Sequence, residues 1–224
     1  RDATAGRRAG RLRIVSCPSA GATVMPPATA RFRAAHPDVE LTLRPAEPED
    51  GMAMVRAGEA DVALTIEPPE SCGISVDGIE RTVLLEDVMY AVLPAGHPLA
   101  RRRRRLTLAD LSGESWILGS GSGTCPDAQI VLDQCRGTGF EPHVAFRSDD
   151  YQAIQGFVAA GVGVSLIPNL ALVTVRDDVV VRSLGAKPPS RLIVAATLEA
   201  AWASPARQAM LEVLREVGEE FAGD

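Results

Sequence analysis

Small hydroxyl and glycine residues stand at two places where an expected strand meets an expected helix. The first is Pro18–Gly21, which follows a β-branched strand, and the second is Gly119–Thr124, which precedes a helix. The start of a helix presents unpaired backbone N–H groups and the positive end of the helix dipole, and this combination attracts small anions. In the first loop, the Ser19 hydroxyl and the N–H groups after it can hold a carboxylate. The strand-loop-helix unit Gly10–Leu41 has a counterpart in Ser148–Pro168, where a helix ends in a Gly-Val-Gly turn and feeds a buried strand. Two such units indicate two lobes that close on one ligand, as in a sensor or receptor.

Both loops also have simpler interpretations. Ser19 can act as a plain helix cap, which is compatible with a ligand contact. The second loop lacks the Gly-Lys-Ser/Thr sequence of a P-loop, so the sequence does not support nucleotide phosphates as ligands. We expect at least one residue of the second loop to contact a ligand. The candidates are Ser120, Ser122, Gly123 and Thr124.

No catalytic or metal-binding set is recognisable among the reactive side chains. Each of the three histidines neighbours a proline, and their spacing matches neither a catalytic triad nor a metal site. The four cysteines lack zinc-type CxxC spacing, and without a secretory signal we expect a reducing cytoplasm rather than disulfides. The sequence therefore predicts no enzyme, no metal and no cofactor. The cysteines are Cys17, Cys72, Cys125 and Cys135.

The elements that position the two loops alternate between strands and helices. Strands are expected at Leu12–Ser16, Val39–Leu43 and Asp61–Ile66, with a helix in each interval. This order predicts a parallel sheet with right-handed crossovers. The apolar run Arg81–Pro94 is too long for one ordinary strand, so we expect it to leave one lobe and enter the other.

Shorter elements follow in the second half of the chain. We expect Asp149 to cap a helix that ends near Ala160, and Ser204 to cap an amphipathic helix at the C-terminus. Further helices are expected at Ala109–Leu111 and Pro126–Arg136, and further strands at Ser115–Leu118, His143–Arg147, Val162–Ile167, Val179–Ser183 and Leu192–Ala196.

Composition and charge narrow the class of protein. Of the 224 residues, 46% are hydrophobic but only 4% are aromatic, so Ala, Val, Leu and Ile must build the core, as in an α/β sheet covered on both faces. The net charge of −6 argues against this chain alone being a nucleic-acid binder. The charge is uneven, because Arg101–Arg105 form a basic run that is either a solvated loop or a contact for DNA or a partner. No apolar stretch approaches the ~20 residues of a membrane span, so we expect no membrane partner.

Seven short motifs occur in an order and spacing that resemble a known family. The chain resembles the effector-binding domain of LysR-type transcriptional regulators over about Gly10 to Phe221. The resemblance implies the type 2 periplasmic-binding-protein fold, which is α/β with two Rossmann-like lobes and a hinge. The motifs are "GRLRI" (Gly10–Ile14), Pro26 with Phe32, "HPDVEL" (His36–Leu41), "AGEADVAL" (Ala57–Leu64), "HPLA" (His97–Ala100), "LTLADL" (Leu106–Leu111) and "VAAGVGVSLIP" (Val158–Pro168).

The resemblance also implies a domain organisation. Residues 1–11 would be the remnant of a linker to a missing DNA-binding domain, residues 12–86 plus 190–224 one lobe, and residues 87–189 the other. The expected function is to sense a small, anionic metabolite in the cleft between the lobes. DNA would be bound by an N-terminal winged helix-turn-helix absent from this chain, and the regulator would be a cytoplasmic homodimer or homotetramer. The alternative is a solute-binding receptor of a transporter, which shares the fold but needs a secretion signal.

The family pattern further suggests roles for individual residues. Ser19, with Ala20 beside it, stands where the family contacts its effector. Thr65 matches a position that lines the cleft, although a buried strand threonine is an equal interpretation. Tyr151 would cover the ligand, and Pro168 would shape the floor of the cleft.

A redox role is an alternative for the second loop. Peroxide-sensing members of the family keep their cysteines in the region of Cys125 and Cys135. A helix N-terminus lowers a thiol pKa and favours the Cys125 thiolate, but the sequence places Asp127 nearby rather than a basic residue. An α-helix would hold Cys135 about 15 Å away along its axis, so a disulfide requires remodelling. A cysteine beside an effector loop is the simpler interpretation.

Overall fold

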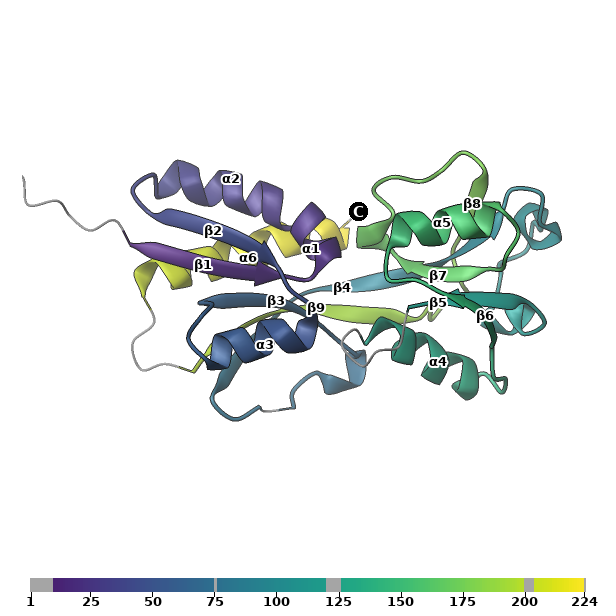
Figure 1. Ribbon diagram of the computed structural model, residues 1–224, viewed down its shortest axis with the longest axis horizontal. Helices are drawn as coiled ribbons and strands as arrows, with labels where there is room; N and C mark the ends of the chain where they lie inside the picture. The colour runs from purple at the N-terminus through teal and green to yellow at the C-terminus, as the bar shows by residue number, and fades with distance from the viewer. Residues whose placement is uncertain (1–9, 75, 120–125, 200–203, 224) are drawn as a thin grey trace, which may run out of the picture. The chain divides into compact units, whose positions relative to one another are not determined.

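The computed structural model describes residues 10–74, 76–119, 126–199 and 204–223 (Figure 1). These residues form two compact units. The first unit comprises the described parts of Arg1–Thr65, Ile74–Leu85 and Val194–Asp224, and the second comprises the described parts of Ile66–Gly73 and Glu86–Ile193. Both units mix helices with strands, as the sequence predicts for an α/β fold.

The sheet of the first unit has the predicted parallel core. Its strand order is β2 (Glu40–Pro45), β1 (Arg11–Ser16), β3 (Val62–Glu67), β9 (Ser190–Leu198) and β4 (Ile79–Pro94). Strand β1 runs parallel to both β2 and β3. The first three strands begin and end within two residues of the predicted positions, because each is a short apolar run that a turn interrupts on either side.

Helices cover this sheet and bury its apolar side chains. On α3 (Pro48–Arg56), Gly51 lies so close to the sheet that a Cβ would stand 3.5 Å from the side chains of Val15 and Ala63. The amphipathic stripe expected at the C-terminus is buried on α6 (Pro205–Gly223), which contacts α2 (Met25–Ala35). The fully buried members of that stripe are Met210, Leu214 and Val217.

The region after β1 corrects one expectation. We expected a turn at Pro18–Gly21 followed by one helix, whereas the structure has two helices, α1 (Pro18–Thr23) and α2, separated at Val24. Pro26 and Pro27 lack the N–H groups that a continuous helix needs for its hydrogen bonds, so one helix cannot run through them. The residues expected to form a turn, Pro18–Gly21, belong to α1, which starts two residues after the end of β1.

The second unit has two sets of paired strands. Strand β4 continues into this unit and pairs antiparallel with β7 (Ser165–Pro168) and β8 (Val179–Arg182). Strands β5 (Ser115–Leu118) and β6 (His143–Arg147) pair in parallel at their predicted positions. Helices α4 (Asp127–Gly137) and α5 (Tyr151–Ala159) belong to the same unit, with the 3-10 helices η1 (Pro69–Ser71), η2 (Pro98–Arg101), η3 (Leu108–Leu111) and η4 (Asn169–Ala171).

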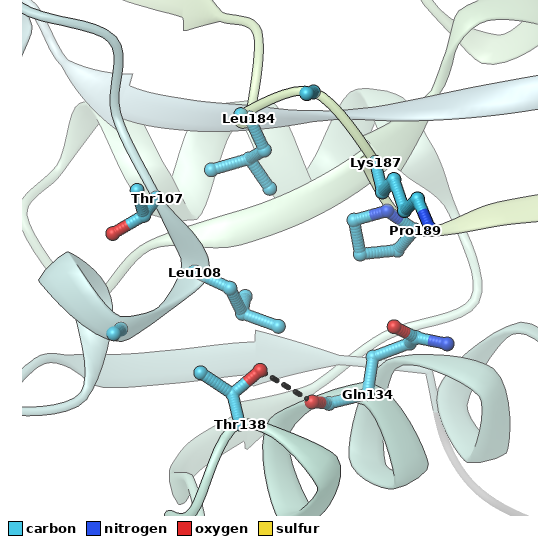
Figure 2. Close-up of a pocket in the computed structure, with 10 residues that line it drawn as sticks. Thr107, Leu108, Gln134, Thr138, Leu184, Lys187 and Pro189 are labelled. Atoms are coloured by element: carbon cyan, nitrogen blue, oxygen red, sulfur yellow. Dashed lines mark hydrogen bonds between the residues drawn. The ribbon is translucent and has the colours of Figure 1, made fainter.

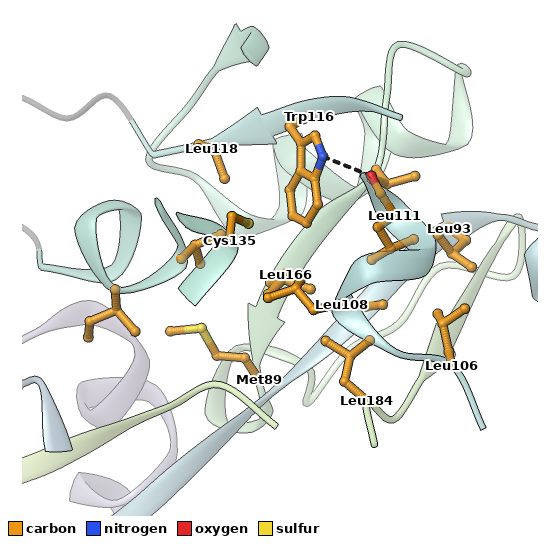
Figure 3. Close-up of a cluster of buried hydrophobic side chains, with 14 residues drawn as sticks. Met89, Leu93, Leu106, Leu108, Leu111, Trp116, Leu118, Cys135, Leu166 and Leu184 are labelled. Carbon is orange, nitrogen blue, oxygen red and sulfur yellow. Dashed lines mark hydrogen bonds between the residues drawn. The ribbon is translucent and has the colours of Figure 1, made fainter. Parts of the chain in front are cut away.

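The largest buried side chain of the second unit organises its core. Trp116 on β5 is fully buried among aliphatic residues, and its Nε1–H donates to the Leu111 carbonyl at 3.2 Å (Figure 3). Met89, Leu106 and Leu166 belong to the same cluster. This hydrogen bond satisfies the only polar atom of the Trp116 indole ring, and the rest of the ring packs against apolar side chains.

Helix α5 corrects a second expectation, because its cap is Asp150 and not Asp149. The Asp150 carboxylate accepts hydrogen bonds from the N–H groups of Gln152 at 2.8 Å and Ala153 at 3.3 Å. The helix starts at Tyr151, one residue later than predicted. Either aspartate satisfies the sequence rule for a cap, so the sequence alone does not choose between them.

The Gly-Val-Gly turn after α5 owes its two glycines to different constraints. Gly161 adopts a φ of +79°, which favours glycine. Gly163 has no such φ, but a Cβ there would lie 2.5 Å from the Ser115 carbonyl oxygen. This close approach lets Val164 pair with β5, since its N–H donates to the Ser115 carbonyl and its own carbonyl accepts from Ile117, each at 2.8 Å.

We therefore predict that Gly163→Ala lowers the free energy of unfolding by about 1–3 kcal/mol, the usual cost of overpacking against backbone. The matched control is Gly156→Ala inside α5, where a Cβ meets nothing within 4 Å. Better helix propensity should make that variant more stable by about 0.5–1 kcal/mol. Urea denaturation of both variants measures the difference, and equal effects would contradict the close-approach explanation.

Candidate functional site

The carboxyl end of β1 brings three predicted residues to one edge of the first unit. The Cys17 N–H donates to the Leu64 carbonyl at 3.0 Å, which ties the start of α1 to β3. Ser19 and Ala20 lie in the first turn of α1, and Thr65 follows Leu64 in β3. Cys17 makes no side-chain capping hydrogen bond at this helix start.

Hydroxyl groups hold the chain around this edge. The Ser16 hydroxyl donates to the Cys17 carbonyl at 2.9 Å, and the Thr23 hydroxyl donates to the Ser19 carbonyl at 2.8 Å. Ser19 is 8% exposed, while Ala20 and Thr65 are almost entirely buried. The edge is therefore a tightly packed wall, and an effector contact for these three residues stays a prediction.

The second unit holds the other predicted residues that the structure describes. Tyr151 starts α5, and its hydroxyl donates to the Asp127 carboxylate at the start of α4. Pro168 ends β7, where it pairs with Met89 of β4. The four candidates of the second loop lie outside the described residues, namely Ser120, Ser122, Gly123 and Thr124.

A buried ion-pair network, which the sequence analysis missed, lies behind Tyr151. The fully buried Arg191 guanidinium contacts Asp87 through Nε at 2.9 Å and Nη2 at 2.8 Å, and it reaches Asp127 through Nη1 at 2.6 Å. The second Asp87 oxygen accepts from the Leu170 N–H at 3.1 Å. One guanidinium thus connects β4, β9 and α4. Arg191 is the only charge in the apolar strand β9, and that was the one signal for a buried ion pair.

This network contains two carboxyl groups and one guanidinium. Burial raises the pKa of Asp87 above its ordinary value, and the neighbouring Arg191 opposes that rise. Asp127 places its other oxygen, Oδ1, in a buried position where it accepts no hydrogen bond from any described residue. Two carboxylates therefore share one cation, with the Tyr151 hydroxyl as an additional donor.

The second unit also contains a small cavity of about 220 Å³ that no predicted residue lines (Figure 2). Leu108, Leu184 and Pro189 provide apolar walls, and Lys187 and Gln134 provide polar side chains. The Thr138 hydroxyl donates to the Gln134 carbonyl at 2.8 Å, so it is already engaged within α4.

The part of the chain that the structure describes contains neither a candidate metal site nor a candidate membrane-spanning helix. No three His, Cys, Asp or Glu side chains gather there in a way that could hold a metal ion. None of the described helices combines the length and the apolar character needed to cross a membrane.

The sequence of this chain is similar to those of known proteins. A family model described as "LysR substrate binding domain" matches residues 5–219. The chain belongs to this family. The LysR-family chain is 32% identical to the probable transcriptional regulator LrrA of Synechococcus elongatus over 216 residues, which are 96% of the chain and 69% of LrrA.

Solved structures agree with the family match. The C-terminal domain of a probable LysR-family regulator from Rhodococcus sp. RHA1 is 26% identical, with a TM-score of 0.77 over 92% of this chain and 98% of that one. The BenM effector-binding domain with its effector benzoate is 22% identical, with a TM-score of 0.83 over 96% and 95% of the two chains. The type 2 periplasmic-binding-protein fold and the effector-binding role of the domain are thereby confirmed.

The LysR-family chain covers only part of its curated relatives. It spans 51%, 69% and 47% of the lengths of three of them, all named as transcriptional regulators. None of the three is named as an enzyme.

The described cysteines of this LysR domain have different surroundings. Cys135 is fully buried in the cluster around Trp116, and this burial, with the nearby Glu141, raises its pKa to about 12. Cys17 is also buried, whereas Cys72 is exposed. Cys125 lies outside the described residues. The raised pKa keeps Cys135 in the thiol form at neutral pH, and a redox role for Cys125 with Cys135 stays a prediction.

We predict that Arg191→Met destabilises the domain by about 3–5 kcal/mol, because it leaves buried carboxylates without their cation. The matched control is Arg176→Met, which removes an exposed pair with Asp178 and should cost less than about 1 kcal/mol. Urea denaturation at neutral pH measures both. Similar stabilities for the two variants would show that the Arg191 network contributes no more than a surface pair.

We also predict that iodoacetamide alkylates Cys72 in the folded domain and spares Cys135 until the domain unfolds. Burial and the raised pKa both suppress the Cys135 thiolate, which is the reactive form. Peptide mass spectrometry after timed labelling reports each cysteine separately, and labelling in urea is the positive control. Comparable rates for Cys135 and Cys72 in the folded state would show that burial does not shield Cys135.

Proposed function

We propose that this domain senses a small organic anion, with a carboxylate as the recognised group. The observation that carries the proposal is the edge of the first unit, where the start of α1 brings Ser19 next to the carboxyl end of β3, which carries Thr65. Backbone N–H groups at a helix start and a neighbouring hydroxyl favour negative charge. Benzoate, the effector of BenM, is itself a carboxylate.

The second unit is proposed to add contacts to the non-carboxylate part of the effector. Tyr151 presents an aromatic ring at the start of α5, and its hydroxyl is already bonded to Asp127. With two carboxylates around Arg191, this region favours neutral or donor groups over a second anion. Pro168 and the loop residues Ser120, Ser122, Gly123 and Thr124 stay predictions for the same effector.

Effector binding is proposed to switch a DNA-binding regulator. The relatives are transcriptional regulators that are longer than this chain, so we propose that a winged helix-turn-helix in the rest of the protein binds DNA and that a cytoplasmic homodimer or homotetramer responds. A ligand can shift such a regulator only by binding one of its states more tightly than the other. Family membership favours this role over a transporter receptor of the same fold.

The test is a thermal-shift screen that pairs small carboxylic acids with their uncharged amides. A compound that binds only the folded state raises the melting temperature with concentration, and it adds about 2.7 kcal/mol of stability at 100 times its Kd. We expect an acid to stabilise the domain while its amide does not. Stabilisation by amides alone would refute an anionic effector.

A double variant and a matched control test where the effector binds. Ser19→Ala combined with Thr65→Val should abolish the shift, because both hydroxyls are removed from the proposed edge. Thr42→Val in β2 is the matched control, since it removes a strand hydroxyl away from the start of α1. A full shift in the double variant would move the site elsewhere in the domain.

A further inference from the structure

An exposed basic segment of the second unit, Arg101–Arg105, has a fixed backbone. We call these five residues the arginine loop, and all five side chains are exposed. At one end, Leu99 and Ala100 pack against the cluster around Trp116. At the other end, the buried Leu106 accepts a hydrogen bond through its carbonyl from the Gly185 N–H at 2.8 Å.

The Arg182 guanidinium clamps the loop from within the same unit. Its Nη1 donates to the carbonyls of Leu99 at 2.9 Å and Ala100 at 2.8 Å. Its Nη2 donates to the carbonyls of Arg102 at 2.9 Å and Arg104 at 3.2 Å. One planar guanidinium thus holds four backbone carbonyl groups. The forked arrangement of the N–H donors on arginine makes these simultaneous bonds possible.

Asp110 holds two of the five arginine side chains. Its Oδ1 accepts from Arg102 at 2.8 Å and from Arg104 at 2.5 Å, while its Oδ2 accepts from the Thr107 hydroxyl at 2.7 Å. The bonds from Thr107, with smaller contributions from the two arginines, lower the pKa of Asp110 to about 2. Asp110 therefore stays ionised at neutral pH.

The remaining arginines are the unusual part of this arrangement. Arg101, Arg103 and Arg105 make no hydrogen bond or ion pair with any residue that the structure describes. A run of like charges normally remains disordered because its members repel one another. Here a clamp and a carboxylate hold the backbone while alternate cations stay available, which is the preorganisation that lowers the entropic cost of binding.

We propose that the arginine loop contacts the phosphodiester backbone of DNA. The proposal rests on the proposed function, because a LysR-type regulator works next to DNA. Guanidinium groups match phosphate oxygens in a two-pronged geometry. The segment is curved, since Arg101 ends η2 and bends follow at Arg103 and Arg104. Its three free guanidinium groups can each bond to a phosphate oxygen.

The negative net charge of the whole chain does not oppose such a contact. Charges farther than about 8 Å are largely screened at physiological ionic strength. The field at the loop therefore comes mainly from its own arginines and from Asp110, which offsets a single positive charge. The contact is independent of DNA sequence, because phosphates carry no sequence information. It adds to the binding by the rest of the regulator and does not replace it.

The test is an NMR titration of this isotope-labelled chain with a short DNA duplex of random sequence at low salt. We expect the amide signals of residues 99–106 to shift. If three phosphates are engaged, doubling the salt concentration should weaken binding about sixfold. A variant with Arg101→Gln, Arg103→Gln and Arg105→Gln should bind at least about tenfold more weakly, while its backbone clamp stays intact.

The matched control removes the same charge elsewhere, with Arg33→Gln, Arg44→Gln and Arg56→Gln on the exposed surface of the first unit. An equal loss in this control, or no shift with DNA, would overturn the proposal. Shifts with poly-glutamate but none with DNA would also overturn it, in favour of an acidic protein partner. The effector thermal shift should be unchanged in both variants, so failure here is separable from failure of the proposed effector site.

Discussion

The second unit depends on one buried cation. Arg191 enters the core from β9, and its guanidinium is bonded to Asp87 of β4 and to Asp127 at the start of α4. A buried charge is tolerated only when its partners compensate for lost water, so these elements can adopt only positions that keep the bonds. Tyr151 extends the network to α5. The starts of α4 and α5 are thus fixed from inside the second unit.

Local signals in the sequence were sufficient for most of the fold. Strands such as Ser115–Leu118 and His143–Arg147 are short apolar or alternating runs bounded by turn residues, and the structure reproduces both bounds. The parallel order of the first three strands followed from the helices between them. The error at Asp149 concerns a helix start, where neighbouring residues satisfy the same local rule equally well. The error at Pro18–Gly21 concerns a helix divided in two near a pair of prolines, and β7 starts at Ser165, three residues later than expected.

The candidate site was less predictable because its contacts join residues far apart in the chain. The side chains of Asp87 and Arg191 meet across 104 positions, and no local pattern encodes which strand charges will pair. The same holds for Arg182 and the carbonyls of the arginine loop. Family resemblance supplied positions such as Ser19 and Thr65, but it supplied neither their burial nor the hydroxyl bonds around them.

The order of the segments along the chain has a consequence for biosynthesis. The second unit is complete once residue 193 has been made, whereas the first unit still lacks the end of β9 and all of α6. A ribosome releases the chain from its N-terminus onward, so the unit that begins first is the unit that finishes last. Until α6 emerges, α2 lacks the helix that it contacts in the folded unit, and its apolar face stays exposed.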